Sequence, residues 1–313
     1  MSRARVYAQL VRLPNLPSAF ADILLGALAT AALPSQWLPF AFLLPASACL
    51  YCAGMVWNDF FDVAQDRRER PFRPIPSGQV SRGEAALVGA VLLLGGVLFA
   101  GLAGLALEHP KHPTWLCGSI ALYLVAAIFL YDGWLKRTPL GPVSMGACRF
   151  LNVLLGLSAS GGLAIRDSTG RDNVGLGVHL AFVVGLYIVG VTWLARTEAR
   201  ASSKKQLTGA ALVMLASLFL GLALAARVAP GIPSPLFPYL LVALGVVVGL
   251  PIQQAIRRPS PERVQAAVKR SLMGLVLLDA VLATALAGSF GLLILLLLGP
   301  SLYLNRKRWL YAT

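Results

Sequence analysis

Long apolar segments alternate with short polar ones along almost the whole chain. Most apolar segments hold about 18 to 24 mainly hydrophobic residues, the length that an α-helix needs to cross a bilayer. This pattern predicts membrane-spanning helices near residues 16–33, 38–58, 84–107, 114–131, 142–164, 178–197, 208–228 and 236–256. The stretch 270–304 fits either one long span or a hairpin near Gly288 to Gly291. We therefore expect an all-α, polytopic transmembrane bundle of nine or ten spans.

The composition agrees with a membrane protein and excludes a sizeable soluble domain. Hydrophobic residues make up 57% of the 313 residues, and charged residues only 13%, against about 25% in soluble domains. The longest polar stretch is the loop that follows Asn58. We expect a single transmembrane domain over residues 1–313.

The net charge of +14 would suggest a nucleic-acid partner in a soluble protein. Here 22 of the 27 Lys and Arg residues fall in alternate polar segments, beginning with the N-terminus, as the positive-inside rule requires. We expect these segments on the cytoplasmic side of a bacterial plasma membrane, with membrane lipids around the bundle and no nucleic acid. The basic residues 306–308 favour the hairpin and ten spans; nine spans with an exported tail is the alternative.

An acidic motif follows the second predicted span. Asn58, Asp59, Asp62 and Asp66 form the pattern N-D-x-x-D-x-x-x-D. The spacing of four places Asn58, Asp62 and Asp66 on one face of a continuing helix, where like charges repel unless they share a cation. Their oxygens are hard ligands, which Mg²⁺ binds together with substrate phosphate oxygens. We expect these four residues to hold Mg²⁺.

Basic residues follow the acidic motif directly. Arg67, Arg68, Arg70 and Arg73 have guanidinium groups that match the geometry of phosphate oxygens. A charged juxtamembrane helix would explain these arginines, but not three aspartates in register before them. We expect the loop to bind a metal–diphosphate substrate, with Arg67 and Arg73 contacting phosphate.

The motif resembles the first signature of a known family. Asn58 to Asp66, followed by the run from Arg73 to Gly78 (R-P-I-P-S-G), is similar to the UbiA superfamily of intramembrane prenyltransferases. The resemblance implies about nine helices around a lipid-open cavity. It also implies Mg²⁺-dependent transfer of a prenyl group from a prenyl diphosphate to a small-molecule or lipid acceptor. Asp59, Asp62 and Asp66, with Asn58, would then be the metal-binding and catalytic acids.

A second polar cluster runs from Tyr131 to Pro142 and resembles the Lys-containing loop of that family. The resemblance implies that Lys136 contacts the diphosphate and acts in catalysis, with Arg137 beside it. Positive-inside anchoring would also explain both residues. Asp132 either orients Lys136 or contacts the acceptor.

A third cluster departs from the family. Relatives usually carry a second aspartate motif after the sixth span, whereas this chain has Glu198 between Arg196 and Arg200. On a helix the two arginines share a face and Glu198 points away. Either Glu198 holds a second Mg²⁺ through water, or the arginines bind the diphosphate in its place. The region resembles a divergent UbiA-like subgroup of bacterial and algal operons, which implies an acceptor other than an aromatic acid or quinone precursor.

Arg149 and Asn152 lie within the fifth predicted span, three residues apart and therefore on one face. A guanidinium in a span faces the bundle interior or a cavity. We expect the pair to line the pocket and recognise phosphate or acceptor. The alternative is a brace between helices, with a carboxylate from another span; Asp279 is one candidate.

These residues predict an ionisation-led prenyl transfer, with the allylic cation against aromatic faces. Candidate rings, each equally a packing residue, are Tyr123, Tyr131, Phe150, Tyr187 and Trp193. The rival classes are a membrane carrier and a prenyl-diphosphate-binding protein without turnover. Acids clustered at one mouth, and no inverted repeat in the span spacing, speak against a carrier.

Overall fold

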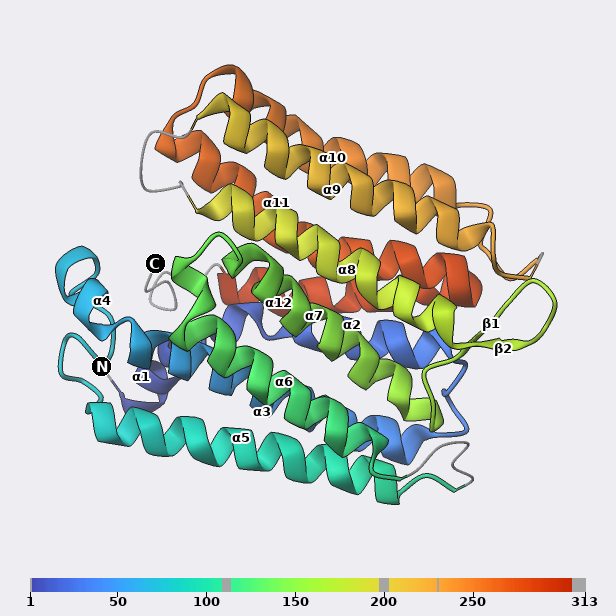
Figure 1. Ribbon diagram of the computed structural model, residues 1–313, viewed down its shortest axis with the longest axis horizontal. Coiled ribbons are helices and arrows are strands. Elements are labelled where there is room, and N and C mark those ends of the chain that lie inside the picture. The colour runs from blue at the N-terminus through green and yellow to red at the C-terminus, as the bar shows by residue number, and fades with distance from the viewer. Residues whose placement is uncertain (1, 109–113, 197–202, 230, 306–313) are drawn as a thin grey trace.

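The computed structural model describes residues 2–108, 114–196, 203–229 and 231–305, which form antiparallel helices running the length of one bundle (Figure 1). The long helices are α3 (Trp37–Phe61), α5 (Arg82–Leu105), α6 (Leu116–Gly133), α7 (Gly141–Leu157), α8 (Val174–Ala195), α9 (Lys204–Ala225), α10 (Phe237–Arg257) and α11 (Pro261–Ala287). The shorter helices are α1 (Arg3–Leu10), η1 (Leu13–Asn15), α2 (Pro17–Ala29), α4 (Val63–Glu69), η2 (Leu135–Arg137), η3 (Ser158–Ser160), η4 (Gly288–Leu297) and α12 (Leu298–Asn305). One small antiparallel sheet pairs β1 (Ile165–Arg166) with β2 (Asp172–Asn173).

The predicted all-α polytopic fold is confirmed. Within the described residues, eight helical segments are long and apolar enough to cross a membrane. The chain is therefore a multi-pass integral membrane protein. The first predicted span, 16–33, is shorter than expected, because helix α2 ends at Ala29.

Helix α2 lies inside the bundle, packed against α3, α7 and α11. Ten of its thirteen residues are buried, on all sides of the helix. A helix with no solvent- or lipid-facing stripe belongs to the interior. Any charged side chain on α2 therefore needs a partner from a neighbouring helix.

The last apolar stretch forms the predicted hairpin. The chain turns at Gly288, which has a positive φ of 60°, and η4 then packs back along α11. At the far end of this arm, the hydroxyl of Ser301 donates to the carbonyl of Pro14 at 3.1 Å, so α12 ends on the same side as α1 (Figure 1). Both arms of the hairpin lie within Pro261–Leu304, the last of the eight candidate spans in the described chain, and α2 is a further, shorter apolar helix.

The hairpin depends on a close approach at Gly291. A Cβ atom there would lie 2.4 Å from the backbone nitrogen of Thr284. Gly291→Ala is therefore expected to destabilise the protein by about 1–3 kcal/mol, the usual cost of overpacking, and to lower its unfolding temperature in detergent. Gly299→Ala is the control, because a Cβ there meets no atom within 4 Å. Equal unfolding temperatures for the two variants would contradict this packing.

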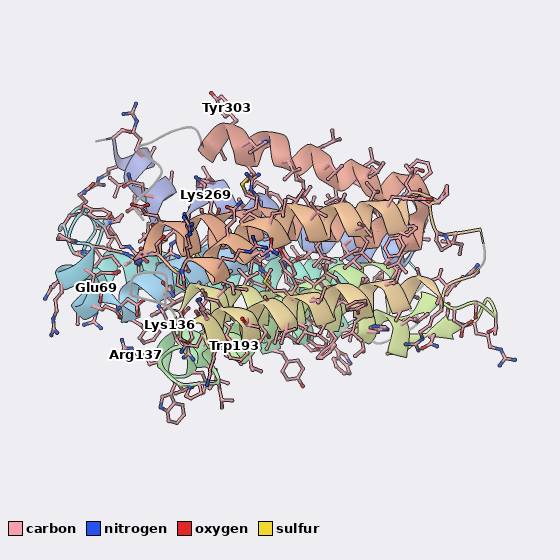
Figure 2. The ribbon with its side chains drawn as sticks, turned by 90° about the horizontal axis from the view of Figure 1, so that it is seen from above. Glu69, Lys136, Arg137, Trp193, Lys269 and Tyr303 are labelled. Carbon is pink, nitrogen blue, oxygen red and sulfur yellow. The ribbon has the colours of Figure 1, made fainter. Side chains whose placement is uncertain are left out.

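The alternate polar segments gather at opposite ends of the bundle, as predicted. Helices α1 and α4 lie at one end and the β1–β2 hairpin at the other (Figure 1). Glu69, Lys136 and Arg137 lie towards the first end (Figure 2). In the turn between β1 and β2, hydrogen bonds from Thr169 lower the pKa of Asp167 to about 2. The acidic motif and the Lys136 loop thus lie at the same end of the bundle, opposite the β1–β2 hairpin.

Candidate active site

The acidic motif lies where α3 ends. The expected continuous helix is wrong: α3 stops at Phe61, and α4 begins at Val63. Asp62 lies between them, and its carbonyl accepts the backbone N–H groups of Gln65 and Asp66 at 2.9 and 2.8 Å. These bonds start a new helix after a bend.

The four residues of the motif nevertheless lie at one buried site. Asn58, Asp59, Asp62 and Asp66 are between 2% and 8% exposed. Burying carboxylates is costly unless they are paired. Each of the three aspartates contacts a basic side chain.

Arg73 bridges two of the acids, as a cation would. One guanidinium nitrogen, Nη1, lies 3.2 Å from Asp59 Oδ1 and 2.8 Å from Asp66 Oδ2. The Arg73 side chain is only 4% exposed. Asp59 and Asp66 therefore converge on a single positive group.

Arg12 is a site residue that the sequence does not distinguish, because a basic N-terminal segment fits the positive-inside pattern equally well. Its Nη2 lies 3.0 Å from Asp59 Oδ1 and 3.2 Å from Asn58 Oδ1. Burial opposes the charge of Arg12, but the charge and hydrogen bond of Asp59, together with Tyr51 and Asp132, outweigh burial and raise the pKa of Arg12. Arg12 follows α1 directly, so the N-terminal segment contributes a permanent positive charge to the site.

Lys136 lies beside the motif, and its predicted contact with the diphosphate stays a prediction. The Lys136 ammonium group bonds to Asp62 Oδ2. Arg137 Nη2 lies 3.8 Å from Asp62 Oδ1 and donates to the carbonyl of Phe61 at 3.5 Å. Asp62 Oδ1 is buried without a hydrogen bond from any described residue, so it could accept one more partner.

The other predicted phosphate-binding arginines lie differently. Arg196, at the end of α8, donates to the backbone carbonyls of Lys136, at 3.3 Å, and Thr138. It therefore supports the η2 turn instead of facing the acidic motif. Arg67 is exposed on α4 and makes none of the ion pairs around the motif in the described part of the chain. The predicted roles of Glu198 and Arg200 fall on residues outside the described ranges.

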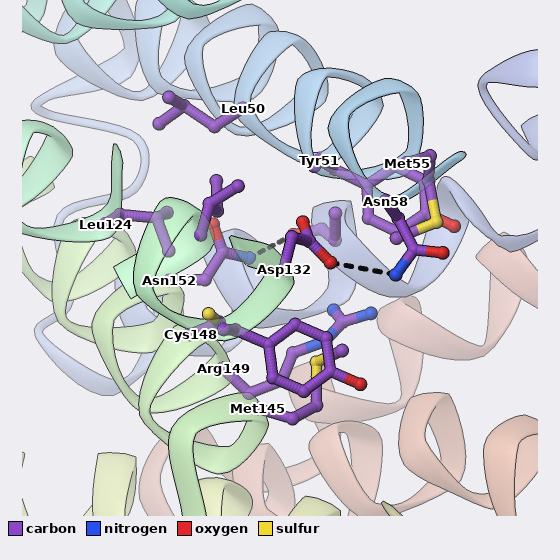
Figure 3. Close-up of a pocket in the computed structure, with 14 residues that line it drawn as sticks. Leu50, Tyr51, Met55, Asn58, Leu124, Asp132, Met145, Cys148, Arg149 and Asn152 are labelled. Atoms are coloured by element: carbon purple, nitrogen blue, oxygen red, sulfur yellow. Dashed lines mark hydrogen bonds between the residues drawn. The ribbon is translucent and has the colours of Figure 1, made fainter. Parts of the chain in front are cut away.

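A cavity in the membrane-spanning part of the bundle reaches the motif at Asn58, the one motif residue that lines it (Figure 3). Asn58 and Asp132 contribute polar groups to it, and Arg149 and Asn152 line it as well. The apolar lining comes from α2, α3, α6 and α7: Ala19, Leu50, Gly54, Met55, Leu124, Ile128, Met145. The cavity thus joins a charged site to an apolar interior.

Arg149 and Asn152 both line the cavity and brace helix α2. Arg149 Nη1 donates to Asp22 Oδ2 at 3.0 Å, and Nη2 donates to the Ser18 hydroxyl at 2.8 Å. Asn152 Nδ2 donates to the same Asp22 oxygen at 2.7 Å. The carboxylate partner of Arg149 is therefore Asp22 and not Asp279.

Asn152 has little hydrogen-bonding capacity left for a ligand. Its Nδ2 also donates to the carbonyl of Ala19 at 3.1 Å, and its Oδ1 accepts from the Ser47 hydroxyl at 2.8 Å. Arg149 keeps further N–H groups, and its side chain is 16% exposed. Of the two, Arg149 is the better candidate for ligand contact.

Of the five candidate rings for cation stabilisation, Tyr131 alone lines this cavity in the described structure. Tyr123 is 66% exposed, and Tyr187 is buried with its hydroxyl on the carbonyl of Ser271 at 2.8 Å. Tyr51, which was not predicted, also lines the cavity, with its ring 5.9 Å from the Arg149 guanidinium. Two tyrosines therefore present aromatic surface to the cavity.

The acidic motif has the chemistry of a Mg²⁺ site. No cluster of three or more His, Cys, Asp or Glu side chains in the described ranges is already arranged around one ion position. However, Asp59 and Asp66 converge on the Arg73 cation, and Asp62 keeps a buried oxygen without a hydrogen bond there. Carboxylate and amide oxygens are the ligands that Mg²⁺ prefers. The residues fit the ion, provided that Arg73 and Lys136 give up part of their contacts.

Comparison with known proteins identifies the family. The model of the UbiA prenyltransferase family matches residues 19–278. The chain belongs to the UbiA prenyltransferase family. This UbiA-family chain is 35% identical over 170 residues to digeranylgeranylglyceryl phosphate synthase of Methanosarcina barkeri, an alignment that covers 50% of the chain and 55% of that protein. The chain thus spans about half the length of this curated relative.

Two solved structures have the same fold. One, from a study of digeranylgeranylglyceryl phosphate synthase in membranes, has a TM-score of 0.62 at 21% identity and covers 91% of this chain and 99% of its own. The other is a UbiA homologue from Archaeoglobus fulgidus bound to GPP and Mg²⁺, with a TM-score of 0.59 at 13% identity. It covers 88% of this chain and 99% of its own. At these identities the likeness establishes the fold alone.

Proposed function

We propose that this UbiA-family chain transfers a prenyl group from a prenyl diphosphate to a small-molecule or lipid acceptor, and that the transfer requires Mg²⁺. The observation that carries the proposal is the meeting of Asp59, Asp62, Asp66 and Lys136 beside a cavity with an apolar lining. The charged residues can bind a diphosphate, and the apolar cavity can hold an isoprenoid chain.

The relatives support the same chemistry. The Methanosarcina barkeri protein is named for synthesis of digeranylgeranylglyceryl phosphate, and the Archaeoglobus fulgidus structure holds GPP and Mg²⁺. We extend the use of a prenyl diphosphate and Mg²⁺ to this chain. The acceptor of the relatives is not extended to it.

The residues of the site have two roles in the proposed reaction: one group would hold the metal, and the other would bind the diphosphate. Asn58, Asp59, Asp62 and Asp66 would hold the metal, and Mg²⁺ when bound would supply positive charge to the diphosphate oxygens. Lys136, together with Arg73, Arg12 and Arg137, would turn from the carboxylates to the diphosphate as the acids engage the ion. These cations would then stabilise the charge that develops on the leaving group.

The cavity would hold the reacting carbon and the acceptor. Cleavage of the bond between C1 and the diphosphate oxygen leaves its electron pair on the diphosphate and a positive charge on the allylic carbons. The rings of Tyr51 and Tyr131 line the cavity where cation–π attraction can act. The acceptor then supplies the electron pair of the new bond to C1, with Arg149 in contact with its polar group, and the released diphosphate would take the proton that the acceptor loses.

We also propose the membrane orientation that the charge pattern predicts, with the N-terminus and the acidic motif on the cytoplasmic side of a bacterial plasma membrane. Residues 1–313 would act as one catalytic domain. Labelling of introduced single cysteines in the 134–140 and 165–173 loops of whole cells tests the orientation: the second should react with an impermeant reagent and the first should not.

The function is tested with purified protein, labelled prenyl diphosphates of several chain lengths and a cell extract as acceptor source. The expected result is release of diphosphate and a labelled adduct with Mg²⁺, and neither with EDTA. Tight Mg²⁺-dependent binding without release would support the alternative, a prenyl-diphosphate-binding protein without turnover. Transfer that is unchanged by EDTA would contradict the proposed chemistry.

Arg196 is expected to act through the Lys136 loop. Arg196→Ala removes the bonds to the carbonyls of Lys136 and Thr138. The rate should fall by about three- to tenfold, the equivalent of one exposed hydrogen bond, because the turn that carries Lys136 becomes less ordered. Arg258→Ala, an arginine after α10 at the same end, is the control. If Arg196 contacts diphosphate directly, the loss would instead appear as a much larger rise in KM for the prenyl diphosphate.

A further inference from the structure

We propose that Asp132 is a positioning residue that fixes the Asn58 amide with its oxygen available to the metal. This inference rests on the proposed function, because it assumes that Asn58 binds Mg²⁺ with the acidic motif. Family resemblance assigns the metal site to the motif on α3 and assigns nothing to Asp132, which belongs to α6.

Asp132 is a buried carboxylate with an unusual partner. It is 5% exposed, and its Oδ1 accepts a hydrogen bond from Asn58 Nδ2 at 2.8 Å (Figure 3). Asp22, Asp59, Asp62 and Asp66 each contact an arginine or lysine. In the described structure, the ion pairs around the site do not include Asp132; its hydrogen-bond partner is a neutral amide. Burial of a carboxylate without a charged partner costs free energy, which suggests that Asp132 has a role beyond stability.

We infer that this role is to set the orientation of the Asn58 amide. An Asn side chain presents an NH₂ group on one side and a carbonyl oxygen on the other, and it can exchange them by turning over. An acceptor oxygen of Asp132 faces the NH₂ side, since Asp132 Oδ1 accepts from Asn58 Nδ2. Asp132 therefore compels Asn58 to point its NH₂ group towards α6.

The opposite side of the amide then faces the charged site. Asn58 Oδ1 accepts from Arg12 Nη2 at 3.2 Å, and the same Nη2 lies 3.0 Å from Asp59 Oδ1. A carbonyl oxygen has two lone pairs, so one remains for a metal ion. An acceptor, the Asp132 carboxyl group, and a donor, the Arg12 guanidinium, thus contact opposite sides of the amide. Groups behind a metal ligand commonly alter metal affinity by 10–100-fold when removed.

The test measures Mg²⁺ affinity and not turnover. Binding of labelled geranyl diphosphate to the purified full-length protein is followed as Mg²⁺ is titrated, for wild type, Asp132→Leu, Asn58→Ala and the double variant. We expect Asp132→Leu to raise the half-saturating Mg²⁺ concentration by about tenfold or more. In the Asn58→Ala background, Asp132→Leu should change it by less than about twofold, because both changes remove one interaction.

Two further variants keep the test clear. Asp132→Asn preserves the size of the side chain and one acceptor oxygen, so it should fold normally and give a smaller shift than Asp132→Leu. Asp167→Asn removes a carboxylate from the β1–β2 turn at the other end of the bundle and should give none.

Two results would overturn the inference: an unchanged Mg²⁺ requirement in Asp132→Leu, or an equal shift with and without Asn58. Wild-type protein that binds no geranyl diphosphate with Mg²⁺ would overturn the proposed function itself, and this inference with it. The outcomes are therefore distinguishable in one set of titrations.

Discussion

Asp62→Asn will lower the rate of prenyl transfer by about a hundred- to a thousandfold, the usual effect of removing one group that stabilises charge in the transition state. Asp62 is the aspartate that bonds to Lys136, and its Oδ1 is buried without a hydrogen bond from any described residue. The amide would remove one negative charge and place an N–H group towards either the lysine or the metal. The measurement is the single-turnover rate of labelled adduct formation at saturating Mg²⁺.

The matched control is again Asp167→Asn, which removes a carboxylate far from the acidic motif. It should retain the wild-type rate. If Asp62→Asn were to transfer prenyl groups at more than about a tenth of the wild-type rate, Asp62 would not hold the metal.

Arg149→Met will destabilise the folded protein by about 3–5 kcal/mol, the usual cost of leaving one partner of a buried ion pair alone. Asp22 is fully buried in α2, and Arg149 provides its charged partner at 3.0 Å. Without the guanidinium, Asp22 keeps the amide of Asn152 as its hydrogen-bond donor. The measurement is the unfolding free energy in mixed detergent micelles.

The compensating variant distinguishes an ion pair from simple loss of packing. Asp22→Asn combined with Arg149→Met removes both charges, so it should recover most of the lost stability. A double variant that is no more stable than Arg149→Met would show that packing of the arginine, and not its charge, supports α2.

The arrangement of the spans could be predicted because it follows from local rules. Apolar length predicted the helices, and alternation of basic segments predicted which loops share an end. The hairpin near Gly288 followed from the position of residues 306–308 in that alternation. None of these inferences required knowledge of which helices are neighbours.

Partners across the bundle could not be predicted. Asp22 stands in an apolar segment, which was a usable signal for a buried pair, but nothing in the sequence joins it to Arg149, 127 residues away. Arg12 matched the positive-inside pattern as well as it matched a site. The bend at Asp62 was missed because the spacing of four in the acidic motif also fits an unbroken helix.

The central claim is tested most directly by release of diphosphate from labelled geranyl diphosphate, measured with Mg²⁺ and with EDTA in wild type and Asp62→Asn. We predict release by the wild type that depends on Mg²⁺ and falls by at least about a hundredfold in Asp62→Asn. Release at equal rates in both proteins, or in the presence of EDTA, would contradict a metal-dependent reaction at the acidic motif.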